Sequence, residues 1–168
     1  MMKKYEQAHQ EHIFNPIYDE ESRILILGTF PSVKSREKQF YYGHPQNRFW
    51  KVLEKLYDSE PLVTIEEKKK FLLQHRIAIW DVIASCDITG SGDSSIKNVV
   101  PTDLSVILEK TKIERIYANG TTAAKLFQKY QKPIVNREII TLPSTSPANA
   151  SYSLERLLEC WKKCKNVL

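Results

Sequence analysis

Apolar residues in this chain follow two patterns, short apolar runs and residues repeated at helical spacing. Short, mostly apolar runs bounded by turn residues are typical of strands that are covered on both faces. The sequence predicts four strands of this kind, over residues 23–27, 77–82, 113–118 and 138–142.

The segments between these runs have the three- and four-residue apolar spacing of amphipathic helices. Thr64 and Glu67 form a capping box at the start of one helix, and Pro45 suits the first turn of another. The sequence predicts helices over about 45–57, 64–75 and 103–110, one entered by a turn at 119–121, and a final one that includes 154–161.

Strands that alternate with helices predict the fold class α/β, in three α/β/α layers with a central, mainly parallel four-stranded sheet. With 168 residues the chain can bury a full-sized core, so we expect a single domain over residues 1–168. Residues 1–22 are polar, and we expect them to form an irregular N-terminal segment.

Three polar loops follow the carboxyl ends of predicted strands, over residues 29–43, 83–101 and 143–150. Functional residues of parallel α/β sheets gather in such loops. The first loop continues into FYYGHPQNRFW, residues 40–50. Three aromatic residues stand there among glycine, proline and polar side chains, which is unusual for a core segment.

Composition and charge add little to this picture. The chain is 42% hydrophobic and 27% charged, as in ordinary soluble proteins, and its net charge of +5 mildly favours polyanionic partners. No apolar run approaches the ~20 residues of a membrane span, and we see no signal-peptide core, so we expect a cytosolic protein without a membrane partner. The three cysteines are then expected to be reduced thiols.

The loops match none of the common cofactor or metal patterns. GTFPS, residues 28–32, follows a strand but is neither a GxGxxG nor a Walker motif, and no residue spacing resembles a zinc site. We therefore expect no cofactor and no metal. Aromatic rings, amides, small hydroxyl residues and cations remain, and these suit an enzyme that handles a base taken out of a nucleic acid.

Several segments can be compared with a known family. GTFPS at 28–32 has the pattern G-x-x-P-G/S, HPQNRFW at 44–50 the pattern H-P-x-N-R-F-W, and LPSTSPAN at 142–149 follows the fourth predicted strand. WDV at 80–82 and SCD at 85–87 follow one another closely. Together these segments resemble the uracil-DNA glycosylase superfamily, and most closely its hypoxanthine (deoxyinosine)-DNA glycosylases, over nearly the whole chain.

The resemblance implies a DNA glycosylase and suggests roles for loop residues. Many superfamily members have Asn or Asp at the position of Phe30, where it positions the attacking water, and a phenyl ring cannot form that hydrogen bond. The resemblance to the deoxyinosine branch implies that Asn47 takes over a catalytic role. Residues 142–149 resemble the loop that enters DNA. The expected DNA-binding residues are Ser32, Lys34, Arg48, Ser144, Ser146, Pro147, Ala148 and Asn149.

The remaining candidates come from the residue types themselves. We expect Tyr42 to stack on an extruded base, with Phe40 or Tyr41 as the alternative ring. His44 is expected to donate to the base or a phosphate, or else to fix the loop, and the backbone at Phe30 to add donors to the base. Asp81, at a strand's carboxyl end, is a second candidate for water activation, or else a helix cap or loop anchor.

Arg48 also belongs to a set of three cations at i, i+3 and i+7, which fits either phosphate contacts or an ordinary solvated helix face. The set is Arg48, Lys51 and Lys55. We therefore expect a monofunctional, monomeric DNA glycosylase whose partner is DNA containing deaminated bases, most of all hypoxanthine. The alternatives are uracil or xanthine as substrate, a DNA-binding member without catalysis, and an enzyme of free nucleosides.

Overall fold

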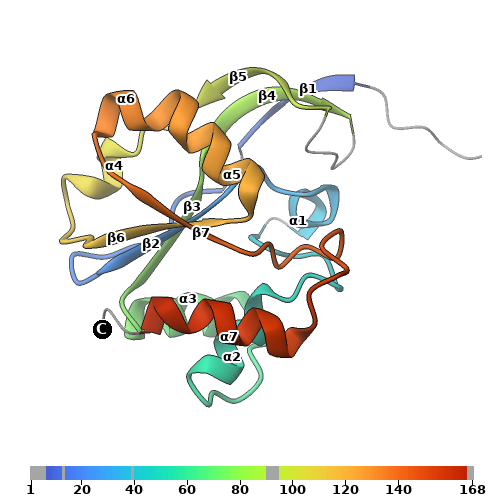
Figure 1. Ribbon diagram of the computed structural model, residues 1–168, viewed down its shortest axis with the longest axis vertical. Helices are drawn as coiled ribbons and strands as arrows, with labels where there is room; N and C mark the ends of the chain where they lie inside the picture. Colours follow the sequence, from blue (N-terminus) through green and yellow to red (C-terminus); the bar gives the residue numbers. More distant parts are fainter. Residues whose placement is uncertain (1–6, 13, 39, 90–94, 166–168) are drawn as a thin grey trace, which may run out of the picture.

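The computed structural model describes residues 7–12, 14–38, 40–89 and 95–165 (Figure 1). Its central sheet has four parallel strands in the order β3-β2-β6-β7. The strands are β2 (Ile24–Gly28), β3 (Ile77–Asp81), β6 (Arg115–Asn119) and β7 (Ile139–Leu142). The predicted α/β fold class with a four-stranded parallel sheet is confirmed.

Helices cover both faces of this sheet, which gives the predicted three layers (Figure 1). One layer consists of α2 (Phe49–Leu56), α3 (Ile65–Gln74) and α7 (Leu154–Lys165). The other consists of α4 (Ser105–Leu108), α5 (Thr121–Leu126) and α6 (Lys132–Val135), with the π-helical turn η2 (Phe127–Gln131) between the last two.

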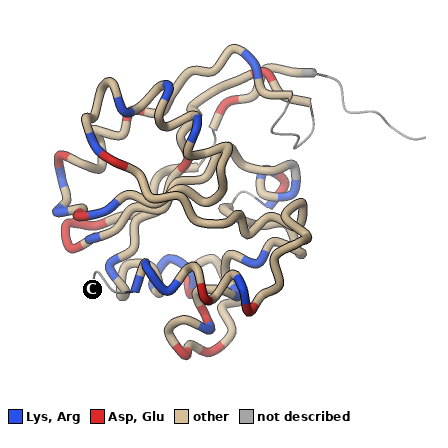
Figure 2. The backbone as a smooth tube through the Cα atoms, viewed as in Figure 1, with Lys and Arg blue, Asp and Glu red and all other residues tan. Residues whose placement is uncertain are grey.

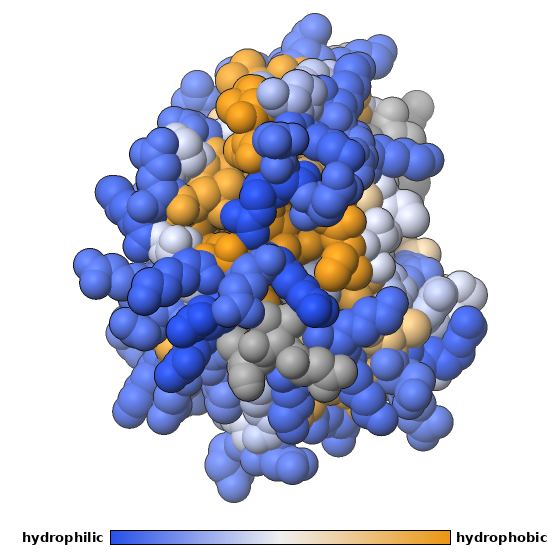
Figure 3. Space-filling model, turned by 60° about the vertical axis from the view of Figure 1, so that its left-hand side comes forward, coloured by the Kyte–Doolittle hydropathy of each residue, from blue (hydrophilic) through white to orange (hydrophobic). Residues whose placement is uncertain are grey.

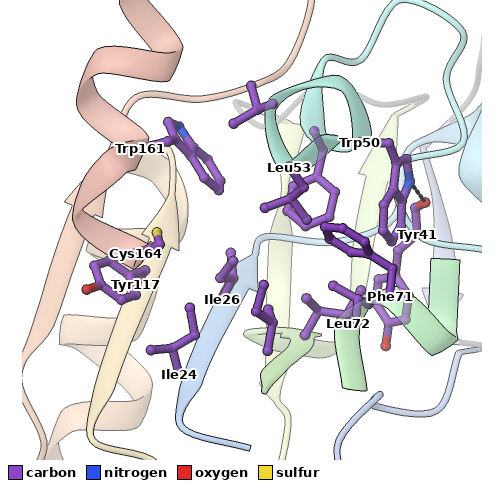
Figure 4. Close-up of a cluster of buried hydrophobic side chains, with 14 of the residues drawn as sticks. Ile24, Ile26, Tyr41, Trp50, Leu53, Phe71, Leu72, Tyr117, Trp161 and Cys164 are labelled. Atoms are coloured by element: carbon purple, nitrogen blue, oxygen red, sulfur yellow. Dashed lines mark hydrogen bonds between the residues drawn. The ribbon is translucent and has the colours of Figure 1, made fainter. Parts of the chain in front are cut away.

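The core is divided by the sheet because successive side chains of a strand point to opposite faces. Ile24 and Ile26 of β2 pack with the layer of α2, α3 and α7, where Trp161 is fully buried (Figure 4). Leu25 and Leu27 pack on the other side. Both faces of β2 are therefore buried, which explains why its sequence is an unbroken apolar run.

A second sheet lies beside the first, and the sequence did not predict it. β1 (Gln7–Glu11), β4 (Ile83–Thr89) and β5 (Lys97–Pro101) form an antiparallel sheet in the order β1-β4-β5. The prediction of a loop over 83–101 is wrong for β4 and β5, and its residues 90–94 lie outside the described part. The expectation of an irregular segment over 1–22 is corrected at β1, whose polar residues gain their strand conformation from backbone pairing with β4.

Two local boundaries also differ from expectation. The loop over 29–43 contains a short helix, α1 (Val33–Lys38). The predicted helix over 45–57 begins only at Phe49, because the Asn47 N–H donates to the His44 carbonyl at 2.9 Å and closes a turn before it. Residues 44–48 are thus held at the edge of the sheet instead of inside a helix.

The surface is mainly hydrophilic on the face that Figure 3 brings forward, with apolar residues gathered near its middle. The large apolar side chains most exposed among the described residues are Val63 and Ile134, at 74% and 73%. Within the part of the chain that the structure describes, no helix has the length and apolar character needed to cross a membrane.

We predict that Trp161→Ala lowers the free energy of unfolding by about 3–5 kcal/mol, because it opens a cavity in the core. The Trp161 ring meets Phe49 edge-on at 6.0 Å between centroids, and its indole N–H donates to the Pro143 carbonyl at 3.0 Å. Urea denaturation measures the change. Val63→Ala, at an exposed site, should stay within about 0.5 kcal/mol of the parent, and an equally small change for Trp161→Ala would contradict the prediction.

Candidate active site

A cavity of about 450 Å³ lies at the carboxyl edge of the central sheet, where α/β folds bind their ligands. Its walls come from the ends of β2, β3 and β6 and from the loops that follow β2 and β7. Most of the predicted site residues line it: Phe30, Ser32, Tyr42, His44, Asn47, Asp81, Ser144, Ser146, Pro147 and Ala148. Lys34, Arg48 and Asn149 are not part of this lining.

Asp81 is the last residue of β3 and stands beside Gly28, its register partner on β2. Its side chain is 5% exposed, and Oδ2 lies 2.7 Å from Nε2 of His12. Oδ1 extends over Gly28, where a β-carbon would lie 2.5 Å from it and 3.0 Å from the Tyr42 hydroxyl. Only glycine at position 28 leaves room for both polar groups at this point of the cavity.

Asn47 is fixed by a hydrogen-bond chain that joins its own loop, the loop after β7 and the end of β6. Its Oδ1 accepts from the Phe49 N–H at 2.9 Å and from the Thr145 hydroxyl at 2.8 Å. Thr145 in turn is held by Asn119, whose Nδ2 donates to Thr145 Oγ1 and whose Oδ1 accepts the Thr145 N–H, both at 3.0 Å. Since Oδ1 is occupied twice, Asn47 presents its Nδ2 donor, which has no partner among the described residues.

Tyr42 lines the cavity with a ring stacked on Phe49, at 3.9 Å between centroids. Its backbone is left-handed, with φ of 52°, which is uncommon for a residue of this size. Burial raises the pKa of Tyr42 above its usual range, the Asp81 carboxylate raises it further, and Asn119 partly offsets this. The hydroxyl is buried, and it lies with Asp81 Oδ1 beside Gly28 at the same point of the cavity wall.

The other two rings of the FYY segment belong mainly to the core. Phe40 is 6% exposed and stacks on Trp50, and Tyr41 is 3% exposed and donates through its hydroxyl to the Asn15 carbonyl. This geometry favours Tyr42 over these two as the ring that a base would meet.

His44 and Phe30 lie on the wall near Tyr42. Nδ1 of His44 accepts the Gln46 N–H at 3.0 Å, which leaves Nε2 as the donor of the neutral ring. Phe30 is partly buried, and its ring faces the imidazole of His12 edge-on at 6.0 Å between centroids. His12 therefore connects the first loop with Asp81, a role that no sequence pattern indicated.

Arg48 holds the loop after β7 in place. Its guanidinium donates to the backbone carbonyls of Asn149 at 3.1 Å, Ser146 at 3.4 Å, and Tyr152. The expected basic face of Arg48, Lys51 and Lys55 is thus divided, because Arg48 turns inward to the loop. A direct contact between Arg48 and DNA stays a prediction.

The loop after β7 is ordered by its own polar groups. Ser144 Oγ accepts the Ser146 N–H, Ser146 Oγ accepts the Ala148 N–H, both at 3.1 Å, and Asn149 Nδ2 donates to the Ser144 carbonyl at 3.0 Å. This loop carries no charged residue, whereas the helices that flank the site carry several (Figure 2). A neutral, rigid loop beside cations suits insertion into a polyanion.

The remaining two candidates lie on or before α1. Ser32 Oγ accepts the Ser35 N–H at 3.1 Å and so caps this helix. Lys34 forms an exposed ion pair with Glu37 at 3.3 Å. Within the described residues, no group of three or more His, Cys, Asp or Glu could hold a metal ion. The prediction that no metal or cofactor is needed stays a prediction.

Comparisons with known proteins agree with this geometry. The sequence model of the uracil DNA glycosylase superfamily matches residues 16–165. A protein named hypoxanthine DNA glycosylase from Methanosarcina acetivorans is 36% identical over 152 residues, covering 85% of this chain and 90% of the relative. One of the same name from Methanosarcina barkeri is 33% identical over 109 residues, covering 64% of this chain and 69% of that relative.

A solved structure is similar as well. The solution NMR structure of a protein from Methanosarcina acetivorans, described as a candidate uracil DNA glycosylase, has a TM-score of 0.78 and 33% identity, covering 94% of this chain and 98% of that one. These matches define the class of protein as a DNA glycosylase, a hydrolase of N-glycosyl bonds. The chain belongs to the uracil DNA glycosylase superfamily, as its motifs predicted.

We predict that Arg48→Gln loosens the loop after β7. Loss of the charged donor leaves several loop carbonyls without their partner, at about 1 kcal/mol or more each. Amide hydrogen exchange over residues 143–152 should therefore become at least ~10-fold faster. Lys51→Gln, on the same helix but exposed, is the matched control and should leave this exchange unchanged. Equal protection in both variants would show that Arg48 does not hold the loop.

Proposed function

We propose that this protein removes deaminated bases, and above all hypoxanthine, from DNA as a monofunctional glycosylase in base-excision repair. The observation that carries the proposal is the pairing of groups across one cavity, a fixed amide donor at Asn47 and a carboxylate at Asp81. The names of the two relatives from Methanosarcina support hypoxanthine as the base.

The reaction needs little more than these two groups. As the bond between C1′ and N9 of the purine breaks, positive charge develops on the sugar and negative charge on the base. A water molecule adds to C1′ and gives up a proton, and the base leaves with the bonding electrons and is protonated. An enzyme accelerates this step by placing donors at the acceptor atoms of the base and a negative group near C1′.

In the proposed arrangement Asn47 is the donor to the base. Its Nδ2 can bond to O6 or N7 of hypoxanthine, and O6 accepts the developing charge, which the amino group of adenine does less well. The second hydrogen-bond partner of Asn47 Oδ1, the Thr145 hydroxyl, keeps the amide from rotating. Asn47 thus acts on the leaving base and not as an acceptor for the water.

In this proposal Asp81 activates and orients the attacking water. In this chain Phe30 occupies the position that in many relatives holds an acceptor for the water. Asp81 reaches the same end of β2 from the neighbouring strand, because Gly28 has no side chain in its way. A carboxylate there would also stabilise the positive sugar.

The rest of the site would bind the extruded nucleotide. The ring of Tyr42, supported from behind by Phe49, would stack on the base, and His44 Nε2 would donate to the base or a neighbouring phosphate. The neutral loop after β7 would press into the duplex, with Ser144 and Ser146 near the backbone. We propose a monomer acting on duplex DNA without a metal or a membrane partner.

The choice of base can be tested by single-turnover excision from duplexes that contain deoxyinosine, deoxyuridine or deoxyxanthosine. We expect alkali-labile sites to form fastest at deoxyinosine, in line with the names of the two relatives. The Asn47 donor matches O6 or N7 of both purines, so faster excision of xanthine would contradict the choice of hypoxanthine but not the donor role of Asn47. Faster excision of uracil would contradict the assignment of hypoxanthine, and absence of product from all three duplexes would contradict the proposed reaction.

We predict that Asn47→Asp reduces excision of hypoxanthine about 10²–10³-fold, the usual cost of removing one donor to a developing negative charge. The aspartate keeps an oxygen for the Phe49 N–H and the Thr145 hydroxyl but removes the donor, so the loop contacts are conserved. Single-turnover rates measure the effect, and circular dichroism confirms the fold. Asn136→Asp, at an exposed position that follows α6, is the matched control. Full activity of Asn47→Asp would exclude the donor role.

A further inference from the structure

His12 is buried, and among the residues that the structure describes its only polar side-chain partner is Asp81. The two side chains are 4% and 5% exposed, and Nε2 of His12 lies 2.7 Å from Oδ2 of Asp81. The segment that carries His12 is fixed by its backbone, because the His12 N–H donates to the Ala84 carbonyl at 2.7 Å. His12 does not line the cavity, so it can reach the reaction only through Asp81.

The tautomer of His12 follows from its second contact. The Phe14 N–H donates to Nδ1 of His12 at 3.2 Å, and a backbone N–H cannot accept a hydrogen bond. Nδ1 is therefore the acceptor, and the ring proton of the neutral imidazole is on Nε2, where it points to Asp81. The backbone thus decides that His12 donates to the carboxylate.

Aromatic rings hold the imidazole in this orientation. The rings of Phe14, Phe30 and Trp80 meet it nearly at right angles, at 5.5, 6.0 and 6.4 Å between centroids. They exclude water from the hydrogen bond between His12 and Asp81, which strengthens it. Phe30, which cannot bind water itself, contributes here by supporting the group behind Asp81.

The two oxygens of Asp81 therefore have different surroundings and different roles. Oδ2 accepts from His12, while Oδ1 lies over Gly28 beside the cavity and has no hydrogen-bond partner among the described residues. We propose that His12 is a positioning residue that fixes the Asp81 carboxylate with Oδ1 directed at the attacking water. This inference rests on the proposed role of Asp81, and it adds a residue from outside the family motifs.

The test separates a donor from a packing residue by using four variants of the full chain. His12→Leu removes the N–H and keeps an apolar group, whereas His12→Gln retains a side-chain N–H that can reach Asp81. Asp81→Asn and the double variant His12→Leu/Asp81→Asn complete a cycle. Single-turnover excision is measured on a deoxyinosine duplex, and Kd on a duplex with the uncleavable 2′-fluoro analogue.

We expect His12→Leu to slow excision at least ~10-fold with Kd changed less than ~3-fold, since His12 does not line the cavity. His12→Gln should recover most of the rate. In the Asp81→Asn background, which is itself slow, His12→Leu should change the rate less than ~3-fold. The inference would be overturned if His12→Leu and His12→Gln slowed excision equally. It would also be overturned if His12→Leu slowed excision by the same factor with and without Asp81→Asn.

The outcomes also distinguish this inference from the proposed function. Full activity of Asp81→Asn would remove the proposed role of Asp81, and with it that of His12. A slow Asp81→Asn beside a fully active His12→Leu would leave the role of Asp81 and overturn that of His12 alone.

Nitrogen-15 NMR of the unmodified protein measures the tautomer of His12 and does not depend on how variants fold. We expect the Nε2–H tautomer, and an Nδ1–H tautomer would overturn the inference.

Discussion

The register between β2 and β3 is the constraint on which the site depends. Parallel pairing sets Gly28 directly beside Asp81, and the pairing continues past the strands through the bond from the Val82 N–H to the Gly28 carbonyl at 2.9 Å. A shift by one residue would turn Asp81 to the opposite face of the sheet. The buried apolar residues that precede it on both strands prevent such a shift, because they would be moved out of their layers. Core packing thus fixes a polar contact at the edge.

The central sheet could be predicted because its signal is local. Each strand is a short apolar run, and the longer covering helices show their own apolar spacing, so neighbouring residues are sufficient to identify both. The sheet of β1, β4 and β5 gives no such signal. Its strands are partly polar, and β1, with the sequence QAHQE, becomes a strand only because β4 offers backbone groups to pair with. Structure of that kind is decided by contacts between distant segments.

The candidate site shows the same division. The resemblance indicated Asn47, and residue type and position indicated Tyr42 and Asp81; all three residues line one cavity. The sequence did not indicate His12, which lies in a segment without any motif, 69 positions from its partner. The inward turn of Arg48 was equally hidden, since a cation on a helix has the same spacing whether it faces solvent or a loop. Residue type predicts which side chains belong to the candidate site, and only the fold shows which of them are in contact.

The chain from Asn119 through Thr145 to Asn47 has a consequence for how the protein meets its substrate. Because these side chains join two loops to the end of β6, the entropic cost of ordering the site is incurred on folding and not a second time on DNA binding. In the proposed reaction on duplex DNA, the duplex would then supply the deformation, by bending and releasing a nucleotide into a cavity whose shape is already set. A weakly paired nucleotide releases most easily, so the stiffness of these loops would itself help to select damaged positions before any chemical group reads the base.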